Sequence, residues 1–226
     1  MNKNIKNVIN TFPKEVQDFI GFETIKEISI GRSGDYVYEI IGVNSFILKI
    51  SIEIERLEYE KNIFQWLKID NKLPVPEVLL WYKTNDKGYL ITKKIKGKMA
   101  CEEYFIKRPL KLISICNDAV QMMRKVELKD FPYPTDLSSL KNKSFSHGDL
   151  CLPNIIIRNN NIVGFLDLGD ASIRDFEYDI ATILRSYEYN IGSKKYSDRF
   201  IDFINTNSKN KINIEYVMKY YPDVFG

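Results

Sequence analysis

The stretch His147-Gly-Asp-Leu-Cys-Leu-Pro-Asn154 contains the only histidine of the 226-residue chain. An aspartate follows the histidine by two residues, and an asparagine follows that aspartate by five. One interpretation is a polar turn between a helix and a strand, and the other is a catalytic loop. Because a lone histidine is more often structural, we expect His147, together with Asp179, to brace the loop by hydrogen bonds rather than to react.

Composition places the chain among globular proteins, with 44% hydrophobic and 28% charged residues. A net charge of +3 is too small to argue for binding to nucleic acid or to an anionic membrane. Three cysteines without a CxxC pair favour free thiols in a reducing cytoplasm. The N-terminus lacks the apolar core of a signal peptide, and no apolar run reaches membrane-spanning length. We therefore expect a cytoplasmic chain, and we expect a monomer.

Charge is unevenly distributed along the chain. Residues 147–189 contain seven acidic residues against three arginines, a net charge of −4. A basic part and a locally acidic part would suit an anionic ligand and a cationic one. Ordinary surface variation is an equally good explanation.

Hydrophobic patterning divides the chain near residues 96–98. Residues 1–96 predict a five-stranded antiparallel sheet with one inserted helix at 53–68. Residues 97–226 predict a mainly helical region in which two short strands at 154–160 and 161–169 are joined by an asparagine-rich turn. The fold class is therefore α+β with two lobes. The predicted strands of the first lobe are 22–30, 36–42, 45–51, 77–83 and 88–95, and the predicted helices of the second are 110–127, 175–189, 194–205 and 214–221.

Two features of the first lobe suit a phosphate-bearing ligand. Glycines in Gly31–Asp35 allow backbone N–H groups to approach phosphate oxygens, although such stretches are usually only turns. Lys49 lies inside an apolar strand, where it is costly unless it meets an anion or reaches solvent. Glu60 on the inserted helix could pair with it, and Ile47 shares its face of the strand. A lysine on an edge strand and a solvated glutamate remain the alternative.

The second lobe offers oxygen ligands and a carboxylate. Asp149 could accept a hydrogen bond from a substrate hydroxyl and orient it for in-line attack on a phosphoryl group. Asn154 and Asp167 supply hard oxygen ligands suited to Mg²⁺.

The motifs as an ordered set resemble the aminoglycoside phosphotransferase family, which has the eukaryotic-protein-kinase-like fold. The resemblance rests on HGDLxxxN from His147, on Asp167-Leu-Gly169 and on Tyr178-Asp-Ile-Ala181. It continues upstream in the segments Gly31–Tyr38, Ile47–Lys49, Tyr59–Lys61 and Leu73–Pro76, and so covers almost the whole chain.

The resemblance implies a role for each of these positions. Asp149 would be the catalytic aspartate, Lys49 would contact the phosphates of ATP or GTP, and Asn154 and Asp167 would bind Mg²⁺. The other nucleotide contacts would come from Ser33, Gly34, Ile47, Glu60 and the backbone of Lys93 and Ile95.

Three departures from the family pattern concern the phosphate acceptor. The acidic helical insertion that usually precedes the HGD motif is reduced to about ten residues, whose charges are Lys141 and Lys143. Tyr189 and Asn190 stand where relatives often have acids, and Asp170 stands where close relatives often have arginine. We expect acceptor contacts from Asp149, Asp170, Glu188 and Tyr189.

The leading hypothesis is a Mg²⁺-dependent kinase that phosphorylates a hydroxyl of an aminoglycoside-like, cationic antibiotic and confers resistance. The alternatives are a kinase of another hydroxylated small molecule, such as a different antibiotic, an amino sugar or a choline-like metabolite, and a catalytically silent nucleotide-binding module. A protein kinase is disfavoured because only eleven residues separate Asp167 from Asp179, too few for a regulated activation loop. A metal hydrolase is disfavoured because one histidine is too few.

Overall fold

A computed structural model of the chain describes residues 8–21, 23–28, 35–42, 45–69, 72–193, 197–207, 212 and 214–221. These residues belong to two compact units. Unit 1 comprises Met1–Gln65 with Pro76–Lys94, and unit 2 comprises Trp66–Val75 with Ile95–Gly226. Within the described part of the chain, no helix has the length and apolar character needed to span a bilayer.

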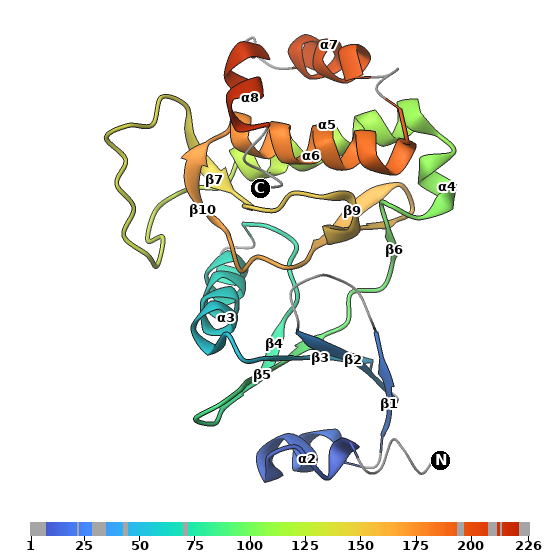
Figure 1. Cartoon of the computed structure of the whole chain (residues 1–226), viewed down its shortest axis with the longest axis vertical. Coiled ribbons are helices and arrows are strands. Elements are labelled where there is room, and N and C mark those ends of the chain that lie inside the picture. Colours follow the sequence, from blue (N-terminus) through green and yellow to red (C-terminus); the bar gives the residue numbers. More distant parts are fainter. Residues whose placement is uncertain are drawn as a thin grey trace. The chain divides into compact units, whose positions relative to one another are not determined.

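Unit 1 is built on a five-stranded antiparallel sheet with the strand order β1-β2-β3-β5-β4 (Figure 1). The predicted sheet and its inserted helix are therefore confirmed. The elements of this unit are α2 (Lys14–Ile20), β1 (Thr24–Glu27), β2 (Tyr36–Ile41), β3 (Phe46–Ser51), most of α3 (Ile54–Lys68), β4 (Val78–Lys83) and β5 (Gly88–Lys93).

The central strand β3 has two chemically different faces because side chains alternate along a strand. Leu48 and Ile50 point into a buried cluster that Phe12 and the α2 residues Val16 and Ile20 complete. Lys49 points to the other face, toward α3. The two helices thus cover opposite faces of the sheet, and the face below α3 is the one that carries a cation.

Unit 2 is mainly helical, as predicted, with two small sheets. Helix α5 begins with a proline at its first position, where the missing N–H costs nothing, and buries an apolar face from Leu112 to Met123. Helix α6 ends at Gly192, whose φ of 69° suits a left-handed cap. The elements are β6 (Lys98–Met99), α4 (Glu103–Ile106), α5 (Pro109–Arg124), β7 (Lys143–Ser146), a 3₁₀ turn (Leu152–Asn154), β8 (Ile155–Arg158), β9 (Asn161–Phe165), β10 (Ser172–Asp175), α6 (Glu177–Ile191), α7 (Ser197–Asn207) and α8 (Ile214–Tyr220).

The predicted asparagine turn joins β8 to β9, which pair as an antiparallel hairpin. Asn159 and Asn160 both have positive φ, 52° and 66°, as a two-residue turn of this kind requires.

The approach to the predicted catalytic loop contains a strand that the sequence did not predict. Lys143–Ser146 forms strand β7, which pairs antiparallel with β10, a second strand absent from the prediction. Serines 144 and 146 are buried there. A binary pattern misses such a strand because its buried positions are polar. The two-residue strand β6 and the single-turn helix α4 were also not predicted, since both are too short to show a period.

One buried carboxylate ties three segments of unit 2 together. Asp175, at the end of β10, is 1% exposed and accepts the backbone N–H groups of Lys141 and Asn142, each at 2.7 Å. It also accepts the hydroxyl groups of Tyr216 (2.5 Å) and Tyr220 (2.9 Å) from α8. Burial opposes its ionisation, but these hydrogen bonds outweigh burial and hold the pKa of Asp175 below its ordinary value.

Replacing Tyr220 by phenylalanine removes one hydrogen bond to this charged group. We expect the free energy of unfolding, measured by urea titration, to fall by about 1.5–3 kcal/mol. Tyr189→Phe is the matched control, because Tyr189 is 78% exposed, and it should change the same quantity by less than about 0.5 kcal/mol. Equal losses in the two variants would contradict the role of Asp175.

The contribution of Asp175 should also depend on pH in a definite direction. Because its pKa is depressed in the folded state, its stabilisation is fully present above the unfolded pKa of about 3.9 and is lost as the pH falls through the folded pKa. The difference in unfolding free energy between the wild type and Asp175→Asn should therefore stay constant from about pH 8 to pH 5. It should shrink only below about pH 4.

Candidate active site

The predicted catalytic loop runs from the end of β7 to the start of β8. Its backbone is closed on itself, because the N–H of Cys151 donates to the carbonyl of Asp149 (2.8 Å) and the N–H of Asn154 donates to the carbonyl of Cys151 (3.0 Å). The loop therefore holds a compact shape that presents the Asp149 side chain.

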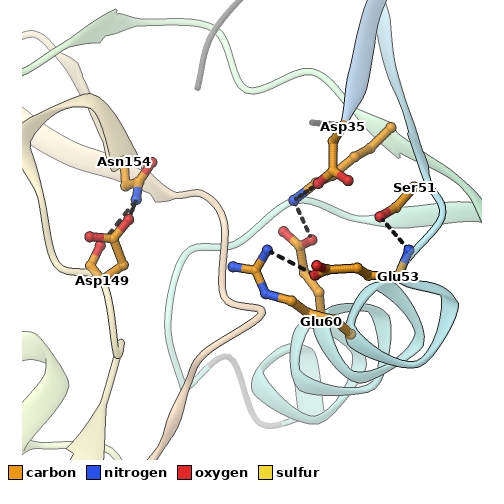
Figure 2. Close-up of polar contacts among 8 residues, drawn as sticks. Asp35, Ser51, Glu53, Glu60, Asp149 and Asn154 are labelled. Carbon is orange, nitrogen blue, oxygen red and sulfur yellow. Dashed lines mark hydrogen bonds and ion pairs between the residues drawn. The ribbon is translucent and has the colours of Figure 1, made fainter. Parts of the chain in front are cut away.

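The carboxylate of Asp149 is fixed through one of its oxygens. Nδ2 of Asn154 donates to the backbone carbonyl of Asp149 (3.0 Å) and to its Oδ2 (3.1 Å) (Figure 2). Sγ of Cys151 lies 3.7 Å from the same Oδ2. Oδ1 accepts no hydrogen bond from any residue that the structure describes. Burial and the negative charge of Asp167 raise the pKa of Asp149, against the hydrogen bonds from Cys151 and Asn154.

Two buried polar side chains of helix α6 form hydrogen bonds with the loop. Asp179 accepts the hydroxyl of Ser146 (2.8 Å) and the backbone N–H of His147 (3.0 Å). Burial raises the pKa of this carboxyl to about 6. Ser186, two turns further along α6, accepts the N–H of Leu152 (3.0 Å). Both ends of the loop are thus tied to one helix.

His147 is fully buried, and its ring belongs to the same scaffold. Its Nδ1 lies 3.4 Å from the backbone N–H of Asp149, and its buried Nε2 has no hydrogen-bond partner among the described residues. Burial lowers the pKa of His147 to about 4, so the ring is neutral at pH 7. A neutral, buried ring cannot deliver a charge to a substrate.

Gly148 occupies a position that only glycine fits. Its φ is 85°, and a Cβ built on it would lie 2.0 Å from the carbonyl oxygen of Asp170. The loop that follows Asp167 therefore packs directly against the backbone of the predicted catalytic loop.

Asp167 follows β9 by two residues, and its negative charge raises the pKa of Asp149. Its φ of 57° is left-handed, which is uncommon for a residue other than glycine and typical of strained functional positions. The N–H of Leu166 donates to the carbonyl of Asn154 (2.9 Å), so the chain brings Asn154 and Asp167 to the same end of the β8–β9 hairpin.

The oxygens at this end of the hairpin fit a magnesium ion. Nδ2 of Asn154 donates to Asp149, so its amide oxygen and the carboxylate of Asp167 are the two side-chain groups here that could act as ligands. Among the described residues, no group of three or more His, Cys, Asp or Glu side chains converges to hold a metal. Mg²⁺ is commonly held by one or two protein oxygens, with water and substrate phosphates completing its shell.

In unit 1, the structure brings Lys49 and Glu60 together as the sequence suggests. The ammonium of Lys49 lies 2.9 Å from Glu60 Oε2, and both side chains are largely buried (Figure 2). A second carboxylate, that of Asp35, lies 3.5 Å from the same ammonium. Lys49 is therefore held between two acids on the α3 face of the sheet, with Ile47 on the same face.

The other predicted nucleotide contacts are partly described. The N–H of Lys93 donates to the carbonyl of Glu77 (2.9 Å), so of its backbone groups only the carbonyl remains a candidate for the adenine edge. Ile95 belongs to unit 2, where its side chain lies beside Gly164. Ser33 and Gly34 lie outside the residues that the structure describes.

The predicted acceptor residues lie on the segment after Asp167 and on α6. Asp170 is exposed, and its carbonyl accepts a hydrogen bond from Arg174 (3.3 Å). Glu188 accepts the hydroxyl of Tyr221, and Tyr189 is 78% exposed.

Sequence reasoning missed several residues of the candidate site. The sequence places Asp35 in a glycine-containing turn and predicts a free thiol at Cys151, and neither prediction includes the contacts seen here. The hydroxyls of Ser146 and Ser186 gave no signal, because serines occur throughout loops and helices. Asp35 had a usable signal, since it directly precedes the strand that pairs with β3.

Comparison with known proteins agrees with this geometry. Residues 123–204, which include the loop, Asp167 and Asp179, match the phosphotransferase enzyme family. This match covers the second half of the chain only in part, and it includes most of the residues of the candidate site. An aminoglycoside 3'-phosphotransferase from Niallia circulans is 24% identical over 264 residues, which cover 97% of this chain and 98% of the relative.

Solved structures show that the chain shares the fold of aminoglycoside phosphotransferases. An aminoglycoside-3'-phosphotransferase of type VIII superposes with a TM-score of 0.76 at 17% identity, with 100% of both chains covered. A Streptomyces rimosus aminoglycoside phosphotransferase, solved with ADP and streptomycin, superposes with a TM-score of 0.69 at 18% identity, covering 86% of this chain and 92% of its own. The predicted α+β, kinase-like fold is therefore confirmed.

Two glycines with positive φ allow the packing around the loop to be tested. Gly148→Ala and Gly192→Ala should each lose about 1–2 kcal/mol of unfolding free energy because alanine disfavours left-handed backbone. Only at position 148 does the new Cβ meet a backbone carbonyl, whereas at 192 nothing lies within 4 Å. Gly148→Ala should therefore cost about 1–3 kcal/mol more than Gly192→Ala in urea unfolding. Equal costs would show that the loop and the Asp170 segment do not pack as described.

Proposed function

We propose that this chain is a kinase that transfers the γ-phosphoryl group of ATP or GTP to a hydroxyl of an aminoglycoside-like antibiotic, and so confers resistance to it. The observation that carries the proposal is the Asp149 carboxylate, which is fixed through Oδ2 while Oδ1 accepts no hydrogen bond from a described residue. The family match and the relatives named as aminoglycoside 3'-phosphotransferases support it.

In the proposed reaction, Oδ1 of Asp149 accepts a hydrogen bond from the acceptor hydroxyl and aligns its oxygen with the γ-phosphorus. The new O–P bond forms while the bond from the γ-phosphorus to the bridging oxygen breaks, so ADP or GDP leaves. The hydroxyl proton passes to Asp149. Its raised pKa, caused by burial and Asp167, favours holding that proton.

We propose that Asn154 Oδ1 and the Asp167 carboxylate hold Mg²⁺, which would neutralise phosphate charge when bound. The hydrogen bond from the N–H of Leu166 to the carbonyl of Asn154, which joins the backbones next to both proposed ligands, supports this assignment.

We assign nucleotide binding to residues 1–96 and acceptor binding with catalysis to residues 97–226. Lys49, oriented by Glu60, would contact the phosphates. Ile47 would cover the adenine, and the backbone of Lys93 and Ile95 would meet its edge. Ser33 and Gly34 would contribute to a phosphate loop. We further propose a monomer that acts in the cytoplasm, where both nucleotides are available.

A specific observation favours keeping other acceptors as a second candidate. Glu188, one of the predicted acceptor contacts, already accepts the hydroxyl of Tyr221. Tyr189 next to it offers an exposed ring rather than a carboxylate. A less cationic hydroxylated molecule, such as another antibiotic or an amino sugar, would depend less on a carboxylate at these two positions. Acceptor contacts from Asp170, Glu188 and Tyr189 are part of the proposal in either case.

Asp149→Asn is the direct test of the mechanism. We expect kcat for nucleotide-dependent phosphorylation to fall about 10²–10⁴-fold, because the amide cannot take the hydroxyl proton. The dissociation constant for ADP with Mg²⁺, measured by calorimetry, should change less than threefold. Asp130→Asn is the control, since Asp130 is exposed and asparagine tolerates its left-handed backbone. Unchanged turnover in Asp149→Asn would refute the assignment.

Lys49 can be tested against a lysine in a matching setting. Lys83 on β4 also pairs with a glutamate of α3, Glu58, at 3.0 Å, but it is 53% exposed. We expect Lys49→Met to lower kcat/KM for the nucleotide at least tenfold, because the variant loses one charge-assisted hydrogen bond to the phosphates. Lys83→Met should change kcat/KM less than twofold. Equal effects would mean that Lys49 only stabilises the sheet.

The acceptor is identified by measuring release of ADP or GDP with a panel of aminoglycosides, other antibiotics and amino sugars. Phosphorus NMR of the product then gives the modified hydroxyl. Turnover with an aminoglycoside is the expected result. Release of ADP only with acceptors outside that class would contradict an aminoglycoside acceptor and favour the second candidate, a kinase of another hydroxylated molecule.

A further inference from the structure

A cavity of about 330 Å³ opens at the far end of the β8–β9 hairpin from the candidate active site. Its walls are Gly97 and Lys98, the α4 side chains of Tyr104 and Phe105, and the turn from Ile157 to Asn160. Strand β8 begins beside Asn154 and ends at Arg158, so about 10–13 Å of strand separates the two ends. The cavity therefore shares no residue with the site proposed for phosphoryl transfer.

Positive charge gathers around the ring of Tyr104. The guanidinium of Arg108 lies 4.0 Å from the ring centroid, and the ammonium groups of Lys111 and Lys98 lie at 5.5 and 5.6 Å. Arg158 lines the cavity from the turn. Lys111 is further fixed by donating to Oδ1 of Asn160, so its ammonium is held at the cavity wall.

Nearby carboxylates do not balance this charge. Glu102 lies 3.9 Å from Lys98, and Glu103 pairs with Lys107. No described carboxylate forms an ion pair with Arg108, Lys111 or Arg158. Arg108 and Lys111 lie at the same Tyr104 ring, and Arg158 lines the cavity that this ring borders, so an anion in the cavity would be attracted by all three.

The floor of the cavity is apolar. Phe105 and Ile157 are 3% and 2% exposed, and Tyr104 adds part of a ring. The volume is at the lower end of the range for small-molecule sites, about 300–1,000 Å³. Lysine and arginine around an apolar floor suit a ligand with one strongly anionic group and a small apolar body.

We propose that this cavity binds a small organic phosphate monoester. The dianionic phosphate would lie against Arg158 and Lys111, because an arginine fork and a fixed ammonium match phosphate oxygens better than a single carboxylate. The organic body would lie over Phe105 and Ile157. This site is independent of phosphoryl transfer and of the proposed acceptor.

The test uses phenyl phosphate as the probe and the full chain saturated with ADP and Mg²⁺. Amide shifts in ¹H–¹⁵N NMR spectra locate binding: we expect changes at Gly97, Asn159 and Asn160 and none at Gly148 or Asp149. Inorganic phosphate should bind at least threefold more weakly, and benzoate at least tenfold more weakly. Shifts confined to residues 148–154, or benzoate binding as well as phenyl phosphate, would overturn the proposal.

Variants separate this site from adventitious binding to surface charge. Arg158→Ala and Lys111→Gln should each raise the dissociation constant for phenyl phosphate at least fivefold. Lys129→Ala, which removes an exposed lysine elsewhere in unit 2, should leave it within twofold. All three variants should keep the thermal midpoint and any phosphotransfer rate of the wild type. Equal affinity in Arg158→Ala, Lys111→Gln and Lys129→Ala would refute a defined phosphate site.

Discussion

The candidate active site depends on one buried carboxylate. Asp179 accepts both the Ser146 hydroxyl and the backbone N–H of His147, and so joins α6 to the strand and the loop that precede Asp149. A buried acid is costly unless its hydrogen bonds are made, which explains why its pKa is raised to about 6 even with these donors. The interaction favours a single loop geometry, because any other arrangement would leave Asp179 buried and unsatisfied. Gly148 then allows the segment after Asp167 to pack against that geometry.

Unit 1 also contains a largely buried charged group that is held by partners, and there the group is a cation. Lys49 interrupts an apolar strand, yet Leu48 and Ile50 still fill the interior on one face while the ammonium lies against Glu60 and Asp35 on the other. A lysine paired with two carboxylates is held in one position. In both units, therefore, a polar group in an apolar setting is held by partners from a neighbouring element. Such positions break the local hydrophobic pattern and are expected at functional sites.

The sequence predicts those elements whose residues show a recognisable composition or hydrophobic spacing. Strands β1 to β5 were predictable because they are rich in β-branched and aromatic residues, and helix α3 because its apolar residues recur at near-helical spacing. The asparagine turn was predictable because asparagine tolerates positive φ. The pairing of Lys49 with Glu60 could be suggested from a misplaced lysine. Strands β7 and β10 could not, because their buried serines and Asp175 look like loop residues. The partners of Asp175 lie 33 to 45 residues away along the chain, so only the tertiary fold reveals them.

Burial reduces the number of acidic side chains that residues 147–189 expose to solvent. The net charge of −4 between residues 147 and 189 suggests a surface that attracts cations, but three of its seven acids, Asp175, Glu177 and Asp179, are at most 2% exposed. Their hydrogen bonds go to Tyr216 and Tyr220, to Asn142 and to Ser146, and they serve the fold. Glu188 is engaged by Tyr221. The acidic segment therefore exposes fewer carboxylates than the sequence implies, and most of its buried charge is used to join β10 and α6 to neighbouring segments.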